Sequence, residues 1–295
     1  MTTTTERIFV IGGTGNVGTK AVNDLVAKDI PVTLYSRNPT KVAELFSNNQ
    51  HVNVIQGDLS DLTLLKEGMK GHTRLFLLYN SFEDFAEKKE AIAKLAYASG
   101  IKQIVDISSF SASEPWRTSF IGTAHIDAEK AILRIPQRGS FVTLRPGRFM
   151  SNLLTFERAS PEGLMFDTVN EDEPQGWISP NDIGAIAAVV LSEDIKKHAD
   201  SVYELIGDII TPAERASIAS RVLERSIRYQ KVSPSIKYDS LMKLGIFPHF
   251  AAYNLAATVP SMAPTTSIST GIFILLGREP ETLEQYILLN KTNLL

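Results

Sequence analysis

The sequence contains no cysteine, and this absence excludes several kinds of chemistry. A chain without thiols forms no disulfide, binds no metal through thiolates and uses no cysteine nucleophile. No apolar run reaches the roughly 18 residues that would span a bilayer. The segment from Met1 to Glu6 also lacks the basic and apolar regions of a secretory signal peptide. We therefore expect a cytoplasmic protein that has no membrane partner.

Charge of one sign is not in excess either. The chain has 30 Lys and Arg against 33 Asp and Glu, a formal net charge of −3, and no dense basic block. Nucleic-acid-binding surfaces are usually strongly basic, so we expect no nucleic-acid partner. The histidines do not stand at ligand-like spacings from carboxylates, so no metal site is expected. The expected partner is a small-molecule substrate, and the sequence leaves a homodimer open.

The first half of the 295-residue chain alternates predicted strands and helices, the pattern of a doubly wound parallel sheet. We expect strands at 8–11, 31–36, 52–55, 75–79, 104–109 and 141–145. The helices between them are expected at 20–26, 39–46, 61–68, 82–99 and 119–134. In such a sheet the loops that bind ligands begin at the carboxyl ends of the strands.

Past residue 147 this alternation stops and turn-rich segments appear. A helix is expected at 180–192, a strand at 202–206 and a helix at 212–223, with helices dominating to the end. We predict a Rossmann-type α/β fold with an NADP-binding domain at 1–155. A smaller, mostly helical substrate-binding or lid region is predicted at 156–295, and its strands are free to rejoin the first sheet.

A glycine-rich turn is the most informative motif of the chain. Gly12-Gly13-Thr14-Gly15-Asn16-Val17-Gly18 follows a predicted strand and opens a predicted helix. Glycines let the backbone approach a phosphate closely, and the free N–H groups of the first helical turn point toward it. The context of strand, turn, helix and second strand favours a dinucleotide site. A tight turn without a ligand is the alternative.

The end of the second predicted strand indicates which cofactor is bound. An NAD enzyme usually has Asp or Glu there, to hold the ribose hydroxyl. This chain has Ser36 and Arg37, with Lys41 one helical turn later. A guanidinium, a hydroxyl and an ammonium suit the additional phosphate of NADP(H). NADP(H) is therefore favoured over NAD(H), unless Arg37 is only a solvated surface arginine.

Several motifs in order resemble the NmrA-like proteins, which are atypical short-chain dehydrogenases/reductases. Besides the glycine turn, they include Ser36-Arg37-Asn38-Pro39, Gly57-Asp58-Leu59, Ser108-Ser109, the segment 144–152 and the segment 178–184. The resemblance covers nearly the whole chain, and it implies the fold and an NADP(H) site.

The resemblance also implies roles for individual residues. The pyrophosphate would be held by Gly12, Thr14, Gly15, Asn16 and Val17, and the adenosine phosphate by Arg37. Asp58 and Leu59 would flank the adenine, and Tyr79, Asn80 and Ser81 would pass beneath the adjacent ribose and phosphates. Ser108 and the segment 145–152, which includes Phe149, would lie nearer the nicotinamide. For Asp58 alone, ordinary turn chemistry is the alternative.

The catalytic pair of ordinary short-chain dehydrogenases is missing. They use Tyr-x-x-x-Lys, in which the lysine lowers the pKa of the tyrosine. None of the eight tyrosines here has Lys four residues later. The corresponding helix carries His125 and Glu129, which share a face, so the carboxylate is expected to orient or charge the imidazole. His125 or Ser108 would then donate a proton or polarise an acceptor, unless His125 only packs locally.

The sequence therefore predicts an NADPH-dependent reductase. Its acceptor would be small and apolar (a quinone, carbonyl, enone or imine), because hydride transfer needs orientation more than a strong acid. The alternative is a non-catalytic redox-sensing regulator that binds NADP(H) and acts through protein contacts. An isomerase that retains its cofactor is disfavoured by the missing tyrosine.

Overall fold

The structure is a computed structural model that describes residues 6–81, 83–258 and 265–294. The chain divides into two compact units. Unit 1 comprises Met1–Ser109, Ala124–Arg145 and Ile183–Tyr203, and unit 2 comprises Phe110–Thr123, Pro146–Asp182 and Glu204–Leu295. The division therefore crosses the chain several times, whereas a single boundary at residue 155 was expected. No helix among the described residues is long and apolar enough to cross a membrane.

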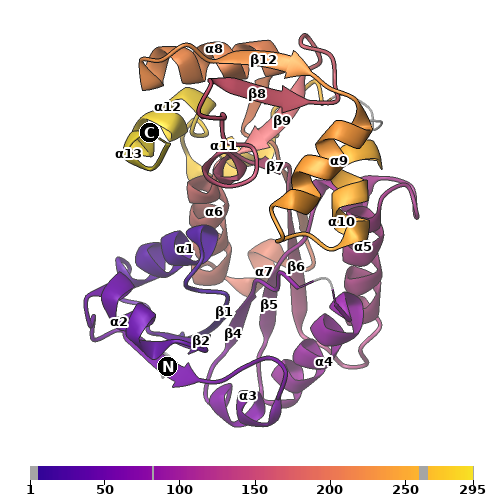
Figure 1. Ribbon diagram of the computed structural model, residues 1–295. Helices are drawn as coiled ribbons and strands as arrows, with labels where there is room; N and C mark the ends of the chain where they lie inside the picture. The colour runs from indigo at the N-terminus through magenta and orange to yellow at the C-terminus, as the bar shows by residue number, and fades with distance from the viewer. Residues whose placement is uncertain (1–5, 82, 259–264, 295) are drawn as a thin grey trace. The chain divides into compact units, whose positions relative to one another are not determined.

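A seven-stranded sheet forms the centre of unit 1, in the order β10-β6-β5-β4-β1-β2-β3 (Figure 1). Its strands are β1 (Ile8–Ile11), β2 (Val32–Ser36), β3 (Val52–Gln56), β4 (Arg74–Leu77), β5 (Gln103–Ile107), β6 (Ser140–Pro146) and β10 (Val202–Leu205). The pairings from β3 through β1 to β6 are parallel. The predicted Rossmann-type sheet is confirmed, and β10 from the second half of the chain does join it.

Helices cover the sheet of unit 1. They are α1 (Asn16–Val26), α2 (Pro39–Phe46), α3 (Thr63–Gly68), α4 (Phe85–Ala98), α5 (Phe120–Leu133), α6 (Pro180–Ser192) and α7 (Ile195–His198). A buried apolar cluster joins α3, α4 and α5 to the sheet through Leu65, Ile92 and Ile132. Helix α6 packs on α1, since a Cβ atom at Gly184 would lie 2.7 Å from the Val17 carbonyl oxygen.

The start of α2 has the predicted capping residues, whereas the predicted start of α4 lies outside the described residues. Asn38 caps α2, because its side chain accepts a hydrogen bond from the Lys41 N–H and Pro39 occupies the first helical turn. Helix α4 begins at Phe85, although the sequence predicted a start at Phe82, a residue outside the described part of the chain.

One buried ion pair ties α4 to β5. The side chains of Lys89 and Asp106 are 0% and 1% exposed, and Nζ lies 2.7 Å from Oδ1. Lys89 also donates to the Ile107 carbonyl oxygen at 2.9 Å and lies 4.7 Å from the centroid of the Phe85 ring. Burial raises the pKa of Asp106 to about 6, against the opposing effect of Lys89. Because neither charge reaches water, each needs the other.

Unit 2 is built from short strands and helices. One sheet has three strands in the order β11 (Asp208–Ile210), β9 (Gln175–Ile178) and β7 (Arg148–Phe149). The other sheet pairs β12 (Arg228–Lys231) with β8 (Leu164–Asp167). Its helices are α8 (Pro212–Leu223), α9 (Pro234–Lys243), α10 (His249–Tyr253), α11 (Thr270–Leu276), α12 (Leu283–Leu289) and α13 (Lys291–Leu294). Turns of 3₁₀ or π type cover Phe110–Ser113, Met150–Leu154 and Asn254–Thr258.

A charged network crosses the core of unit 2 around Trp177. Arg148 contacts Glu157 at 2.7 Å and Asp167 at 2.8 Å, and its guanidinium lies 4.7 Å from the centroid of the Trp177 ring. Although burial opposes ionisation, Arg148 and Lys237 hold the pKa of Asp167 well below its usual range. The network joins β7, β8, β9 and α9 within this unit.

The buried ion pair of unit 1 leads to a first prediction. Replacing Lys89 with Met leaves Asp106 buried without its partner, so we expect a loss of about 3–5 kcal/mol in the free energy of unfolding. Lys94→Met is the matched control on α4, because its pair with Glu90 is solvent-exposed and should contribute less than about 0.5 kcal/mol. Urea unfolding of both variants measures the difference. Equal losses would contradict the argument.

Candidate functional site

The glycine turn between β1 and α1 contains two kinds of glycine. Gly12 has φ +82°, and a Cβ atom there would lie 2.6 Å from the Leu78 carbonyl oxygen. A Cβ atom at Gly18 would lie 2.2 Å from the Gly12 carbonyl oxygen. Gly15 differs, because among the described residues a Cβ atom there would meet only that same oxygen, at 3.8 Å. Folding thus requires glycine at 12 and 18, whereas the space beside Gly15 is open to a ligand.

The start of α1 suits an anion. Gly15 is the N-cap and offers no side-chain hydrogen bond, and the first turn holds no acidic residue. The first N–H groups of a helix lack partners within the helix and carry its partial positive charge. Thr14 is half-buried and Asn16 is exposed, while Val17 is buried and offers only its backbone. The open space at Gly15 and these N–H groups fit the pyrophosphate of a dinucleotide.

The predicted phosphate-binding residues lie at the end of β2. The Arg37 side chain is 83% exposed, and its Nε lies 3.8 Å from Asp58 Oδ2. Lys41 is exposed in the first turn of α2, and the Ser36 hydroxyl oxygen accepts a hydrogen bond from the Asn38 N–H at 3.2 Å. Hydrogen bonds from Ser60, and then the charge of Arg37, lower the pKa of Asp58. Two cationic side chains can therefore reach an anion here.

Tyr35 supports the neighbouring loop, a role that was not predicted from the sequence. Its hydroxyl donates to the carbonyl oxygens of Asp58 at 3.3 Å and Asp61 at 3.4 Å. A Cβ atom at Gly57 would lie 2.2 Å from the Tyr35 side chain, so only glycine fits there. The buried aromatic ring at the end of β2 thereby holds the loop that carries Asp58 and Leu59. A tyrosine followed by Gly-Asp after the next strand is the signal that could have indicated this support.

The segment after β4 completes the predicted cofactor edge. Tyr79 is half-buried, donates to the Glu83 carbonyl oxygen at 3.4 Å, and stacks at 5.7 Å from Phe85. Asn80 and Ser81 are exposed. Because β5, β4, β1, β2 and β3 are neighbours and parallel, their carboxyl ends share one edge of the sheet. The loops that follow these strands and carry most of the predicted residues of unit 1 therefore begin at this edge, and Figure 1 shows β5, β4, β1 and β2 side by side.

Ser108 lies just past β5 at the same edge, and it is buried. Its hydroxyl donates to Glu129 Oε1 at 2.5 Å. Arg145 binds the same carboxylate twice, with Nε 3.0 Å from Oε1 and Nη2 2.5 Å from Oε2. The side chains of Glu129 and Arg145 are only 4% and 13% exposed. The three side chains thus form a nearly buried hydrogen-bonded group, built from β5, α5 and β6.

Glu129 does not favour the charged form of His125, so the charging half of the expectation, that Glu129 would orient or charge the imidazole, was wrong. Burial, followed by the nearby charges of Lys89 and Arg145, holds the pKa of His125 well below its ordinary value of 6.5. Its Nδ1 has no hydrogen-bond partner in the part of the chain that the structure describes, and its ring meets Phe85 edge-on at 4.7 Å. The carboxylate of Glu129 is instead occupied by Arg145 and Ser108. His125 is therefore a neutral imidazole.

Lys89, Asp106 and Arg145 also belong to this polar cluster, and their membership was not predicted from the sequence. A signal was present for two of them. Lys89 falls on the same helical face as the buried Phe85, Ile92 and Ala96, which is an unusual position for a lysine. Asp106 precedes Ser108 by two residues on β5, so both side chains point to the same face.

Known proteins are similar to this chain in both sequence and fold. The NmrA-like family model matches residues 4–287. The chain belongs to the NmrA-like family. A (4-alkanoyl-5-oxo-2,5-dihydrofuran-3-yl)methyl phosphate reductase of Streptomyces griseus is 28% identical over 236 residues, which are 80% of each chain. An NAD(P)H azoreductase of Xenophilus azovorans is 27% identical over 240 residues, 81% of this chain and 82% of that one.

A solved structure is similar over most of this NmrA-like chain. It is an NADPH-dependent quinone oxidoreductase from Escherichia coli complexed with NADPH, with a TM-score of 0.79 and 25% identity. The match covers 95% of this chain and 98% of that chain. Together with the family match, it establishes the fold of the NmrA-like chain over nearly its full length.

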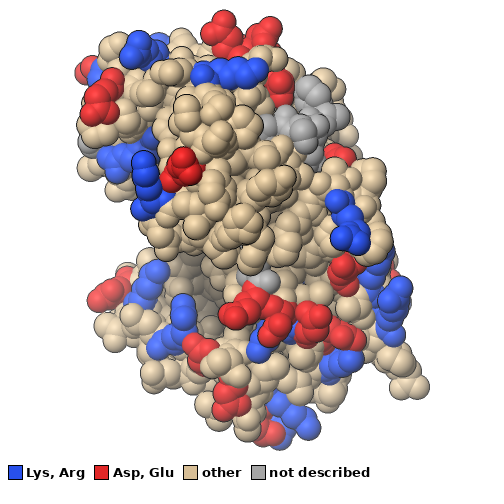
Figure 2. All heavy atoms as spheres, turned by 45° about the vertical axis from the view of Figure 1, so that its right-hand side comes forward, with Lys and Arg blue, Asp and Glu red and all other residues tan. Residues whose placement is uncertain are grey.

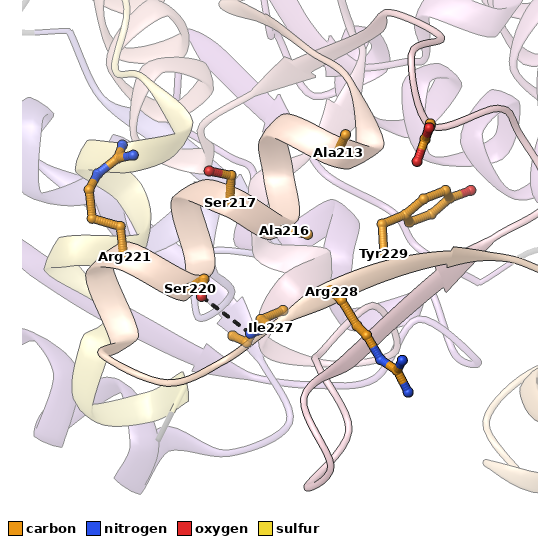
Figure 3. Close-up of a pocket in the computed structure, with 9 residues that line it drawn as sticks. Ala213, Ala216, Ser217, Ser220, Arg221, Ile227, Arg228 and Tyr229 are labelled. Atoms are coloured by element: carbon orange, nitrogen blue, oxygen red, sulfur yellow. Dashed lines mark hydrogen bonds between the residues drawn. The ribbon is translucent and has the colours of Figure 1, made fainter.

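Unit 2 of the NmrA-like chain has a surface groove of its own (Figure 3). The groove has a volume of about 620 Å³ and lies along α8 and β12. Ala216, Ser217 and Arg221 contribute from the helix, and Arg228 and Tyr229 from the strand. None of the predicted site residues lines it. Phe149, predicted near the nicotinamide, lies in β7 of this same unit.

Surface charge on the NmrA-like chain is mixed. On the face shown in Figure 2, basic and acidic side chains are interspersed and much of the area is neutral. That face therefore has no extended field of one sign among its described residues. No group of three or more His, Asp or Glu side chains that could hold a metal ion is found in the described ranges.

Because His125 is held neutral, we expect the free energy of unfolding to depend on pH. The unfolded chain protonates this histidine near pH 6.5, whereas the folded chain resists protonation, so stability is lost as pH falls below about 6.5. One such group contributes a slope of about 1.4 kcal/mol per pH unit. His125→Gln should reduce the loss of unfolding free energy between pH 6.5 and pH 5, as measured by urea unfolding. Parallel curves for both proteins would show that His125 is not held neutral.

Proposed function

We propose that this chain is an NADPH-dependent reductase whose cofactor lies along the carboxyl edge of the unit 1 sheet. The observation that carries the proposal is the open space at Gly15, directly before a helix start without acidic residues. The relatives support the class, since their names describe a (4-alkanoyl-5-oxo-2,5-dihydrofuran-3-yl)methyl phosphate reductase, an NAD(P)H azoreductase and an NADPH-dependent quinone oxidoreductase. A cytoplasmic location and a homodimer remain predictions.

The cofactor residues act in three groups. Gly12, Thr14, Gly15, Asn16 and Val17 hold the pyrophosphate through backbone and side-chain donors. Arg37, with Ser36 and Lys41, binds the adenosine phosphate and favours NADP(H) over NAD(H), although Arg37 must also share its charge with Asp58. Asp58 and Leu59 flank the adenine, and Tyr79, Asn80 and Ser81 lie along the ribose. Phe149 is proposed to contact the nicotinamide end.

The bound cofactor supplies the hydride, so the chain needs mainly to orient the acceptor. His125 is proposed to donate a hydrogen bond from a neutral imidazole, and Ser108 is proposed to lie at the same reacting end. A neutral imidazole is a weak acid, which suits a small apolar quinone, carbonyl, enone or imine that needs polarisation rather than full protonation. No Tyr-x-x-x-Lys pair takes part.

Binding of the two nicotinamide cofactors tests the phosphate site. Arg37→Ala should weaken NADPH binding about 10- to 100-fold, because it removes a charged hydrogen bond, and should leave NADH binding nearly unchanged. Fluorescence titration measures both affinities. Arg134→Ala, which removes another exposed arginine, is the control. An unchanged NADPH affinity in Arg37→Ala would remove this residue from the site.

A panel of acceptors tests the reaction itself. After NADPH binding is established, quinones, aldehydes, enones and imines are added and NADPH oxidation is followed by absorbance. We expect one class to be reduced. His125→Ala should lower kcat about 10- to 100-fold with little effect on NADPH affinity, and His125→Gln, which retains an N–H donor, should recover part of the rate.

The outcomes of the panel separate the candidate functions. Equal rates for His125→Ala and the parent would exclude His125 from the reaction. Tight NADPH binding without oxidation by any class would favour the redox-sensing regulator. Failure to bind NADPH would contradict both functions.

A further inference from the structure

The hydroxyl of Ser108 has a single proton, and its neighbours determine where that proton lies. Both oxygens of Glu129 accept from Arg145, in the two-point contact that is characteristic of an ionised carboxylate. An ionised carboxylate only accepts hydrogen bonds. In the 2.5 Å contact between Ser108 Oγ and Glu129 Oε1, the serine must therefore be the donor. Its oxygen lone pairs remain for any group bound beside it.

The surroundings keep this arrangement in place. The Glu129 side chain is 4% exposed and the Arg145 side chain 13%, so water does not compete strongly for either charge. Lys89 and Asp106 form a second buried pair nearby, at 2.7 Å, and Asp106 faces the same side of the sheet as Ser108. The two pairs are electrically neutral together, and His125 remains uncharged. Little in the cluster would move the Ser108 proton away from Glu129.

We propose that Glu129, anchored by Arg145, is a positioning residue that accepts the hydrogen bond of the Ser108 hydroxyl. The oxygen of Ser108 is then left to accept a hydrogen bond from a bound N–H or O–H group. The proposal rests on the proposed reductase function. It reverses the role of proton donor that the sequence suggested for Ser108. Polarisation of an acceptor oxygen then falls to His125 alone.

Two bound groups have the required N–H or O–H chemistry. One is the NH2 group of the nicotinamide carboxamide, and the other is an amine or hydroxyl group on the substrate that accepts the hydride. The acetylpyridine analogue of NADP distinguishes them, because a methyl ketone replaces the carboxamide and removes its N–H donors. The ratio of the two dissociation constants, analogue over NADP, is an equilibrium measurement that does not depend on turnover.

The experiment compares the parent, Ser108→Ala, Glu129→Gln and the double variant. If the carboxamide is the donor, the parent should bind NADP about 5- to 10-fold more tightly than the analogue. Each single variant should bring that ratio close to one, and the double variant should match Ser108→Ala. If the substrate that accepts the hydride donates the hydrogen bond to Ser108, the ratio of the two dissociation constants is near one in all four proteins. In that case kcat/KM falls equally in both single variants and no further in the double variant.

Non-additivity is the result that a merely structural role would not produce. The proposal is overturned if Glu129→Gln matches the parent in both the ratio of dissociation constants and kcat/KM, while Ser108→Ala differs from the parent. Effects that multiply in the double variant also overturn it, because Glu129 would then act independently of Ser108. Lys130→Gln, an exposed neighbour on α5, is the control and should match the parent.

Two safeguards keep the test decisive. If Glu129→Gln does not fold, Arg145→Lys replaces it, since a lysine keeps the charge and loses the two-point contact that fixes the carboxylate. That variant should lower the same ratio, or kcat/KM, in the direction of Ser108→Ala, and values equal to the parent overturn the proposal. Failure of the parent to bind NADP overturns the proposed function and this inference with it. Intact NADP binding with additive effects overturns this inference alone.

Discussion

The close approach of Gly18 to the Gly12 carbonyl oxygen is the constraint on which the rest of this site depends. A single Cβ atom at Gly18 would lie 2.2 Å from that oxygen, so α1 can begin this close to β1 only without a side chain there. The approach places the free N–H groups of the first helical turn at the carboxyl edge of the sheet, next to the open space at Gly15. Arg37 and Tyr79 reach the same edge because β2 and β4 are the two neighbours of β1.

Electrostatic balance below that edge explains the character of the reacting end. Two buried cations, Lys89 and Arg145, are matched by the carboxylates of Asp106 and Glu129. Burial, and then the nearby charges of Lys89 and Arg145, keep the pKa of His125 low, because protonation would add an unmatched charge in the same buried region. The cluster therefore provides oriented neutral donors and acceptors rather than a strong acid. This is compatible with a reaction in which a cofactor supplies the hydride.

Local sequence signals predicted much of the fold but less of the site. Helices α6 and α8 have the predicted bounds, because proline at the first turn and a long apolar face mark them clearly. Strands β7, β8, β9, β11 and β12 were not predicted, since they are two to four residues long and lie past residue 147, where the strand–helix alternation that marked the equally short β1 and β4 stops. The glycine turn and Arg37 were identifiable because their motifs are contiguous. The partner of Glu129 was not, because Arg145 lies 16 residues away and only the pairing of β5 with β6 places it beside Ser108.

Transfer of deuterium from C4-deuterated NADPH to an acceptor, measured by mass spectrometry of the product, tests the central claim most directly. With a carbonyl, enone or imine acceptor, we expect one deuterium on carbon in the product, and with every acceptor we expect a lower rate when the transferred position carries the isotope. A hydroquinone exchanges its O–D with water, so for a quinone acceptor the isotope effect on the rate is the decisive result. A carbon-centred product without deuterium, a rate unaffected by deuterium on either face of C4, or no product with any acceptor class despite tight NADPH binding would contradict hydride transfer by this chain.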